Sequence, residues 1–179
     1  MPGDPHRPVL VACVGNVLHS DDGFGHAVAI RLMAHPEVPE LAHVIETGIG
    51  GMALVQEAMR GYDALLIVDA YARGGVPGQL YFLEAALTSL AHLDLHQRRD
   101  YFADTHYATP DRALHLLAGM GRLPPVVRIL GCEPADVETL GVGLSAPVAA
   151  AVEPAVTRAC DWLRSLRPDI GGRGAIAAR

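Results

Sequence analysis

The segment Tyr62–Tyr71, YDALLIVDAY, contains four consecutive aliphatic residues without any alternation of apolar and polar positions. A strand with one face in water alternates, whereas a strand covered on both faces is apolar throughout. The run is also far shorter than the roughly 20 apolar residues of a membrane-spanning helix. It therefore predicts the central strand of a sheet that is covered by helices on both faces, which is an α/β arrangement.

The rest of the sequence alternates between strand-like and helix-like patterns. A strand is typically a short apolar run ended by Gly or Pro, whereas a helix repeats its apolar residues every three or four positions. The other expected strands are Pro8–Gly15, His43–Met52, which breaks into a Gly-rich loop, Gly78–Ala85 and Pro125–Pro134. The expected helices are Asp22–His35 with Ser20 as its N-cap, Ala53–Arg60, a short helix opening with Pro110, and roughly Ser145–Arg167.

The fourth strand is expected to run against the others. Gly78 comes only about nine residues after Asp69, and a parallel neighbour needs a crossover of about a dozen residues or more. We therefore predict that Gly78–Ala85 is antiparallel. The predicted fold class is α/β: a three-layer sandwich in which helices cover both faces of a five-stranded, twisted, mostly parallel sheet.

Length and charge limit the size of the protein and the kind of partner it binds. With 179 residues, half of them hydrophobic, the chain is long enough for one domain with a real core. We expect a single α/β domain over residues 1–167, a flexible Gly-rich tail over 168–179, and a monomer. The net charge is −6, Lys is absent and Arg is scattered. This argues against nucleic acid or an anionic membrane as partner, because both bind a basic face.

The cysteines and the N-terminal residues bear on the cellular compartment. The three cysteines are widely spaced and form no CxxC pair, so neither a disulfide framework nor a Cys-based zinc site is expected. The N-terminal stretch MPGDPHRP has no apolar signal core, and no apolar run reaches membrane-spanning length. The expected setting is the cytoplasm, without membrane insertion.

Polar residues follow the predicted parallel strands, at the edge where α/β sheets bind their ligands. Asp69 directly follows the apolar run, where a buried charge is costly unless a cation or hydrogen bonds compensate it. Asp22 follows the first strand, and His106 lies in a loop between the fourth and fifth strands. Two carboxylates and an imidazole with open positions suit Ni, Zn, Mn or Fe. Taken alone, the residue type of Asp69 instead favours a helix cap or an acceptor of loop N–H groups.

The roles of several neighbouring residues stay open at this point. His26 stands four residues after Asp22, and both His26 and His19 are either additional ligands or surface histidines. Asp21 suits the positive end of a helix dipole. If the chain catalyses a reaction that needs a general base, Asp21 or Glu133 is a candidate.

Other chemistries fit the sequence less well. The stretch Gly48–Gly51 is not a GxGxxG motif, and neither GxxxxGK[ST] nor GxSxG occurs, so nucleotide binding and serine-hydrolase chemistry lack support. Cys13 lies within an apolar strand and is expected in the core. Cys132 stands at a strand end, where it is either a thiol nucleophile or a buried structural residue.

Five motifs, in unbroken order, make this sequence similar to the hydrogenase maturation endopeptidases over about residues 9–163. They are GNVLHSDDGFG, ETGIGGM, LLIVDAYARGGVPGQL, DTHYATPDRAL and ILGCEPADVETLGVGLSAPVAAAVEPAV. The resemblance implies a five-stranded twisted sheet between helices. Carried over by position, it also implies that Asp22, Asp69 and His106 bind a metal and form the catalytic site. Many members of the family have Glu where this chain has Asp22.

The resemblance further implies a substrate and a metal. The substrate is the large-subunit precursor of a nickel-iron hydrogenase, cut just past a Cys-x-x-Cys-x-x-His/Arg motif once nickel has been inserted. Nickel arrives with the substrate and is read by the three ligands, and zinc or cadmium could occupy the site in the isolated protein. The alternative is a metal-binding maturation chaperone without proteolysis. A small-molecule α/β enzyme that uses the Gly-rich loop is a third and weaker hypothesis.

Overall fold

The computed structural model describes residues 9–49, 51–87 and 110–166, together with 89, 90, 92, 94, 96 and 97. A short 3-10 helix, η1 (Ser20–Gly23), precedes the first α-helix. The strands are β1 (Val9–Val14), β2 (Ala42–Gly48), β3 (Ala64–Ala70), β4 (Leu80–Glu84) and β5 (Val126–Cys132). The α-helices are α1 (Phe24–Met33), α2 (Gly51–Ala58), α4 (Pro110–Gly119) and α5 (Ala146–Ser165).

The strands form one sheet in the order β2-β1-β3-β5-β4. The β1–β2, β1–β3 and β3–β5 pairs are parallel, and β4 pairs with β5 in the antiparallel direction. The predicted α/β class, the number of strands and the antiparallel fourth strand are therefore confirmed. The strand β3 lies in the middle of the sheet, as its continuous apolar run requires.

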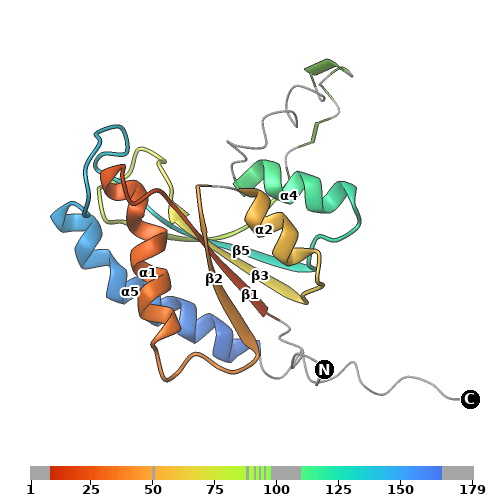
Figure 1. Cartoon of the computed structure of the whole chain (residues 1–179), viewed down its shortest axis with the longest axis horizontal. Helices are drawn as coiled ribbons and strands as arrows, with labels where there is room; N and C mark the ends of the chain where they lie inside the picture. The colour runs from red at the N-terminus through yellow and green to blue at the C-terminus, as the bar shows by residue number, and fades with distance from the viewer. Residues whose placement is uncertain are drawn as a thin grey trace, which may run out of the picture.

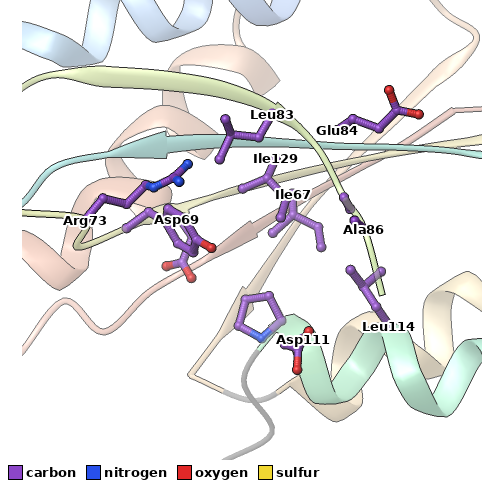
Figure 2. A pocket seen from close by; sticks show the side chains of 12 residues that line it. Ile67, Asp69, Arg73, Leu83, Glu84, Ala86, Asp111, Leu114 and Ile129 are labelled. Carbon is purple, nitrogen blue, oxygen red and sulfur yellow. The ribbon is translucent and has the colours of Figure 1, made fainter. Parts of the chain in front are cut away.

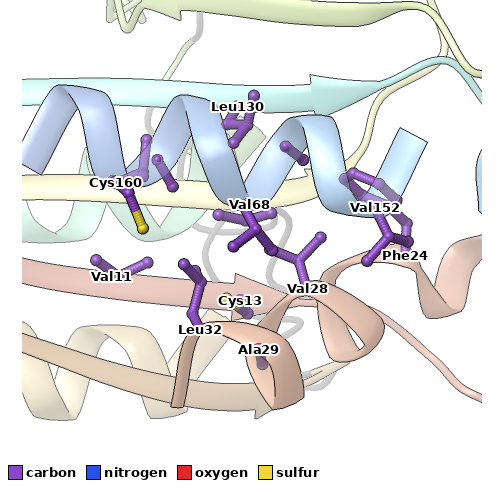
Figure 3. Close-up of a cluster of buried hydrophobic side chains, with 14 of the residues drawn as sticks. Val11, Cys13, Phe24, Val28, Ala29, Leu32, Val68, Leu130, Val152 and Cys160 are labelled. Atoms are coloured by element: carbon purple, nitrogen blue, oxygen red, sulfur yellow. The ribbon is translucent and has the colours of Figure 1, made fainter. Parts of the chain in front are cut away.

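Helices cover both faces of this sheet (Figure 1), with α1 and α5 on one face and α2 and α4 on the other. Successive side chains of β3 alternate between the two faces. Leu66 and Val68 pack in the cluster under α1 and α5, while Leu65 and Ile67 pack under α2 and α4. Figure 3 shows the first cluster, where Val68 lies between Leu130, Val28 and Cys13. Each face therefore has its own core, and the three-layer arrangement follows from the two.

The connection from β1 to α1 brings the helix unusually close to the sheet. A Cβ at Gly25 would lie 1.9 Å from the carbonyl oxygen of Val14 and 2.8 Å from that of Val68. Both distances are far below a van der Waals contact, so this approach requires glycine. The tight packing holds the preceding η1 turn, which contains Asp22, against the carboxyl ends of β1 and β3.

Some local details differ from the expectation. The α-helix begins at Phe24 and not at Asp22, because residues Ser20–Gly23 form the 3-10 turn. Ser20 has a φ of 47° and does not cap α1, whose N-cap position is Gly23 without a side-chain hydrogen bond. The second strand ends at Gly48, where φ is 57°, at the expected Gly-rich loop, but α2 starts at Gly51 and not at Ala53.

The described residues end at Leu166, so the tail predicted over residues 168–179 lies outside them. Among the helices of the described part of the chain, none combines the length and the apolar character needed to cross a bilayer.

Candidate functional site

The order in which strands are added to the sheet reverses at β1, and a ligand-binding site is expected at this position. From β1 the chain crosses to β2 on one side, and β3 then lies on the other side of β1. In parallel α/β sheets, the crevice outside the carboxyl ends of such strands is where ligands bind. Asp22 follows β1 and Asp69 is the next-to-last residue of β3, so both stand at this crevice.

Asp69 is half-buried at the end of β3, and its environment disfavours the charged form. Burial, and then the negative charge of Asp22, raise the pKa of the Asp69 carboxyl from 3.8 to about 8, against a smaller opposing effect of the Ala70 backbone N–H. The parallel register, with Cys13 of β1 opposite Val68 of β3, places the ends of both strands at one edge, which agrees with this effect of Asp22 on Asp69. The interpretation that Asp69 caps a helix finds no support here, because Asp69 is the next-to-last residue of a strand and lines a cavity.

Asp22 is held by the loop that precedes it. Its Oδ2 accepts a hydrogen bond of 3.1 Å from the Asn16 backbone N–H, which also contacts the Asp22 carbonyl oxygen at 3.1 Å. Burial raises the pKa of the Asp22 carboxyl, while that hydrogen bond and the nearby charge of His19 partly oppose the rise. Asp22 and Asp69 are thus two neighbouring carboxyls whose environments both disfavour their ionised forms. A cation between them would relieve this cost.

The third predicted ligand, His106, lies outside the residues that the structure describes. Among the described residues, no three His, Cys, Asp or Glu side chains gather closely enough to hold a metal ion. The structure therefore brings together Asp22 and Asp69, and the part of His106 stays a prediction. The chemistry of the donor set fits a divalent metal, because carboxylates supply oxygen ligands of the kind that Mn, Zn and Ni accept.

Asp21 has a different task from that of its neighbour. It is fully buried. Its Oδ1 accepts a hydrogen bond of 2.6 Å from the Ser145 backbone N–H, and its Oδ2 accepts bonds from the Ala135 N–H at 2.8 Å, the Asp136 N–H at 3.2 Å and the Ser145 hydroxyl at 2.9 Å. Burial would raise the pKa of Asp21, but these hydrogen bonds outweigh it and lower the pKa below 3.8. Asp21 therefore anchors the η1 turn to the segment after β5.

Glu133, the other candidate base, is also fully engaged. It is 5% exposed. Its carboxylate accepts bonds from the Arg73 N–H at 2.8 Å, the Gly74 N–H at 3.0 Å and the Tyr81 hydroxyl at 2.7 Å. The Tyr81 hydroxyl is the strongest influence, and together with the backbone N–H groups it lowers the pKa of Glu133. Glu133 thereby holds the turn that follows β3.

A cavity of about 560 Å³ lies next to Asp69, on the face of the sheet that α4 covers. Figure 2 shows its apolar floor, formed by side chains such as Ile67, Leu83 and Ile129 from the three strands β3, β4 and β5. The full lining is Ile67, Asp69, Tyr71, Arg73, Leu83, Glu84, Ala85, Ala86, Pro110, Asp111, Leu114 and Ile129. A largely apolar cavity beside two carboxyls can accommodate part of a peptide chain while the polar groups act on it.

Arg73 brings a positive charge to this cavity, and nothing in the sequence pattern marks it. Its guanidinium lies 5.9 Å from the centre of the Tyr71 ring and 5.6 Å from that of Tyr81, distances typical of cation–π contacts. Its position depends on the turn that Glu133 holds. Sequence reasoning missed this group because only the three-dimensional structure brings Tyr81 next to the turn.

The structure also locates the other histidines and cysteines that the sequence analysis singled out. His26 points to the end of β2, where its Nδ1 lies 2.8 Å from Glu46 Oε1, so its described partner is Glu46. His19, by contrast, is close enough to Asp22 for its charge to act on that carboxyl. Cys13 and Cys132 are buried, and burial raises the pKa of the Cys132 thiol to about 11. A thiol in this state is a poor nucleophile, which supports the structural interpretation of Cys132.

Comparison with known proteins gives a consistent result. The model of a family described as hydrogenase maturation protease matches residues 26–162. The hydrogenase expression/formation protein HupD of Bradyrhizobium diazoefficiens is 29% identical over 174 residues, covering 95% of this chain and 85% of that protein. HupD of Rhizobium leguminosarum bv. viciae is 30% identical over 168 residues, covering 91% and 78%.

A solved structure agrees with these sequence matches. The hydrogenase maturating endopeptidase HybD from E. coli superposes with a TM-score of 0.70 at 25% identity, covering 88% of this chain and 92% of that one. The family match includes Asp69 and His106, while Asp22 lies four residues before its start.

Proposed function

This chain belongs to the hydrogenase maturation protease family, as its motifs predict, and from this premise we propose that it is an endopeptidase. Its substrate is the large-subunit precursor of a nickel-iron hydrogenase, from which it removes the C-terminal extension after nickel insertion. Membership in the family supports both the peptidase activity and the hydrogenase substrate. The more specific part of the proposal is that Asp22, Asp69 and His106 recognise the nickel.

The observation that supports this more specific part is the pair of carboxyls at the carboxyl ends of β1 and β3. Asp22 and Asp69 lie close enough for one charge to raise the pKa of the other, and both are partly withdrawn from water. A divalent cation stabilises such a pair, because its charge offsets both the cost of burying the two carboxylates and the repulsion between them. An imidazole from His106 would complete the ligand set.

The raised pKa of Asp69 supports a simple account of how nickel-loaded precursor is selected. Near neutral pH, Asp69 keeps its proton for much of the time. A precursor that carries nickel displaces this proton and is held by both carboxylates, whereas a nickel-free precursor meets a neutral group. The cavity beside Asp69 then takes up part of the substrate chain and excludes water from it. A divalent metal held here would polarise the scissile carbonyl as a Lewis acid.

Metal binding by the isolated protein is expected to strengthen with pH. Because binding releases the Asp69 proton, the affinity for zinc or cadmium should rise between pH 6 and pH 8, by up to about tenfold per pH unit. The same carboxyl has a folded pKa of about 8 against 3.8 ordinarily. Its contribution to stability is therefore complete below about pH 4 and is lost as the pH rises through 8. Added metal should restore the lost stability.

Calorimetric titration in two buffers of different ionisation enthalpy measures the proton release directly. For the wild type we expect release of close to one proton near pH 7, and for Asp69→Asn weaker binding with almost none. Equal affinity at pH 6 and pH 8 in the wild type would contradict the assignment of Asp69.

Glu133 is expected to matter for stability and little for chemistry. In Glu133→Gln an amide NH2 replaces either Oε1, which accepts from the Gly74 N–H, or Oε2, which accepts from the Arg73 N–H and the Tyr81 hydroxyl, so a backbone donor loses its acceptor and the melting temperature should fall. Precursor cleavage should stay within about tenfold of the wild type, since loss of a general base costs roughly 10²- to 10⁴-fold. A larger loss at unchanged melting temperature would instead make Glu133 the base.

A metal-binding chaperone remains the second candidate, because Asp22 stands where many members of the family have Glu. Incubating nickel-loaded precursor with a tenfold smaller amount of this protein separates the two functions. An endopeptidase converts all of the precursor and leaves no lasting complex. A chaperone leaves the precursor intact and co-elutes with it in size-exclusion chromatography.

A further inference from the structure

Three aliphatic side chains stand out from the surface next to the candidate site. Leu18 is 58% exposed, Leu140 is 75% exposed and Val142 is 84% exposed. Single exposed aliphatic residues are common on protein surfaces, but several from distant parts of the chain that gather at one place mark an interaction site. We name Leu18, Leu140 and Val142 the aliphatic rim.

The backbone brings these residues together. His19 forms an isolated parallel bridge with Gly141. The Gly141 N–H donates to the Leu18 carbonyl oxygen at 2.9 Å, and the Ser20 N–H donates to the Gly141 carbonyl oxygen at 2.9 Å. The segment after β1 and the segment after β5 therefore lie side by side. Leu18 and Leu140 each precede a residue of the bridge.

The rim is held in place by the buried carboxylate of Asp21. Its oxygens fix both ends of the segment after β5, through the Ala135 and Asp136 N–H groups at one end and Ser145 at the other. A surface that is already ordered loses little conformational entropy when it binds a partner. Exposed aliphatic side chains on such a fixed support are suited to docking.

The rim is also continuous with the candidate site. His19 lies between the two: its backbone takes part in the bridge to Gly141, and its charge acts on the Asp22 carboxyl. A protein chain that reaches Asp22 past His19 therefore lies next to the rim. Of the possible occupants, a substrate protein processed at Asp22 is the one whose position this continuity explains.

We propose that the aliphatic rim docks the body of the hydrogenase large-subunit precursor, through an apolar surface next to its cleavage segment. This inference rests on the proposed function and extends it from the cut segment to the folded substrate. It assigns the substrate contact to residues outside Asp22, Asp69 and His106, so it predicts that binding and chemistry can be separated by mutation.

The test compares the double variant Leu140→Asp/Val142→Asp with the control Ile30→Asp/Met33→Asp on α1. Ile30 and Met33 are 53% and 56% exposed and lie outside the rim, so the control adds the same charges elsewhere. Both the Kd for full-length precursor and the kcat and KM of cleavage are measured. In the rim variant we expect Kd and KM to rise at least about tenfold with kcat within about twofold. The control should match the wild type.

The outcomes separate the two proposals. If the wild type cleaves and the rim variant binds and cleaves like it, the docking proposal is overturned and the function stands. If the wild type binds without cleaving and the rim variant loses binding, the docking surface stands and the endopeptidase fails. If the rim variant merely converts a dimer of this protein into monomers in sedimentation and leaves Kd unchanged, the occupant is a second copy and the proposal is wrong.

Discussion

Replacement of Asp69 by Asn is expected to abolish cleavage of the nickel-loaded precursor while the protein stays folded. Loss of a group that merely supports a metal ligand costs about 10- to 100-fold, so loss of one that contacts the metal should cost at least about a hundredfold. The substitution keeps the shape of the side chain. It also removes a carboxyl whose pKa is raised to about 8, so the melting temperature at pH 8 should be no lower than that of the wild type.

Asp63→Asn is a matched control for this variant. Asp63 directly precedes β3 and therefore stands at the opposite edge of the sheet, away from Asp22 and the cavity. Its replacement should leave kcat/KM for the precursor unchanged. Cleavage at the wild-type rate by Asp69→Asn, measured under the same conditions, would remove Asp69 from the mechanism.

The second large effect concerns the adjacent residues Asp21 and Asp22. Replacing Asp21 is expected to lower stability, whereas replacing Asp22 is expected to abolish activity. Asp21→Ala removes the buried acceptor of four partly buried hydrogen-bond donors of the segment after β5. Hydrogen bonds to charged groups contribute about 1.5–3 kcal/mol each, and these share one carboxylate. We expect a loss of roughly 3–5 kcal/mol, at the upper end for point substitutions. Asp22→Ala should cost little stability and abolish cleavage.

Thermal unfolding and precursor cleavage are measured on both variants and on Asp21→Asn, which keeps the volume of the side chain. Asp21→Asn should fall between the wild type and Asp21→Ala in stability. Because the pKa of Asp21 is lowered, its stabilising effect should be present above about pH 4 and be lost as the pH falls below it. A stable Asp21→Ala protein would contradict the anchoring role. An unfolded Asp22→Ala protein beside a folded Asp21→Ala protein would likewise contradict it.

The sequence predicts the layout of the sheet well because the determining signals are local. The uninterrupted run before Asp69 requires a covered central strand, and the short connection to Gly78 excludes a parallel neighbour. Asp22 and Asp69 follow from these strands, since the carboxyl ends of parallel strands share one edge. Their proximity is therefore predictable from the pattern of elements alone.

Which of the two acids anchors the fold and which belongs to the candidate site is not predictable in this way. Asp21 and the segment that donates hydrogen bonds to it are more than a hundred positions apart, since Ala135 follows Asp21 by 114 residues. No periodicity in the sequence reports that a loop folds back over such a distance. The same holds for Glu133, which reaches the turn at Arg73 and the strand at Tyr81. The sequence motif identifies the acidic pair, and the long-range hydrogen bonds decide which member anchors the fold.

The measurement that tests the central claim most directly is the intact mass of the cognate large-subunit precursor after incubation with this protein. Nickel-loaded and nickel-free precursor are compared, with wild type and with Asp69→Asn. We predict a single loss of the C-terminal extension in the nickel-loaded sample with wild-type protein, and an unchanged mass in the other three. Equal cleavage of the nickel-free precursor would contradict the reading of nickel by Asp22, Asp69 and His106, and no cleavage of the nickel-loaded precursor would contradict the endopeptidase itself.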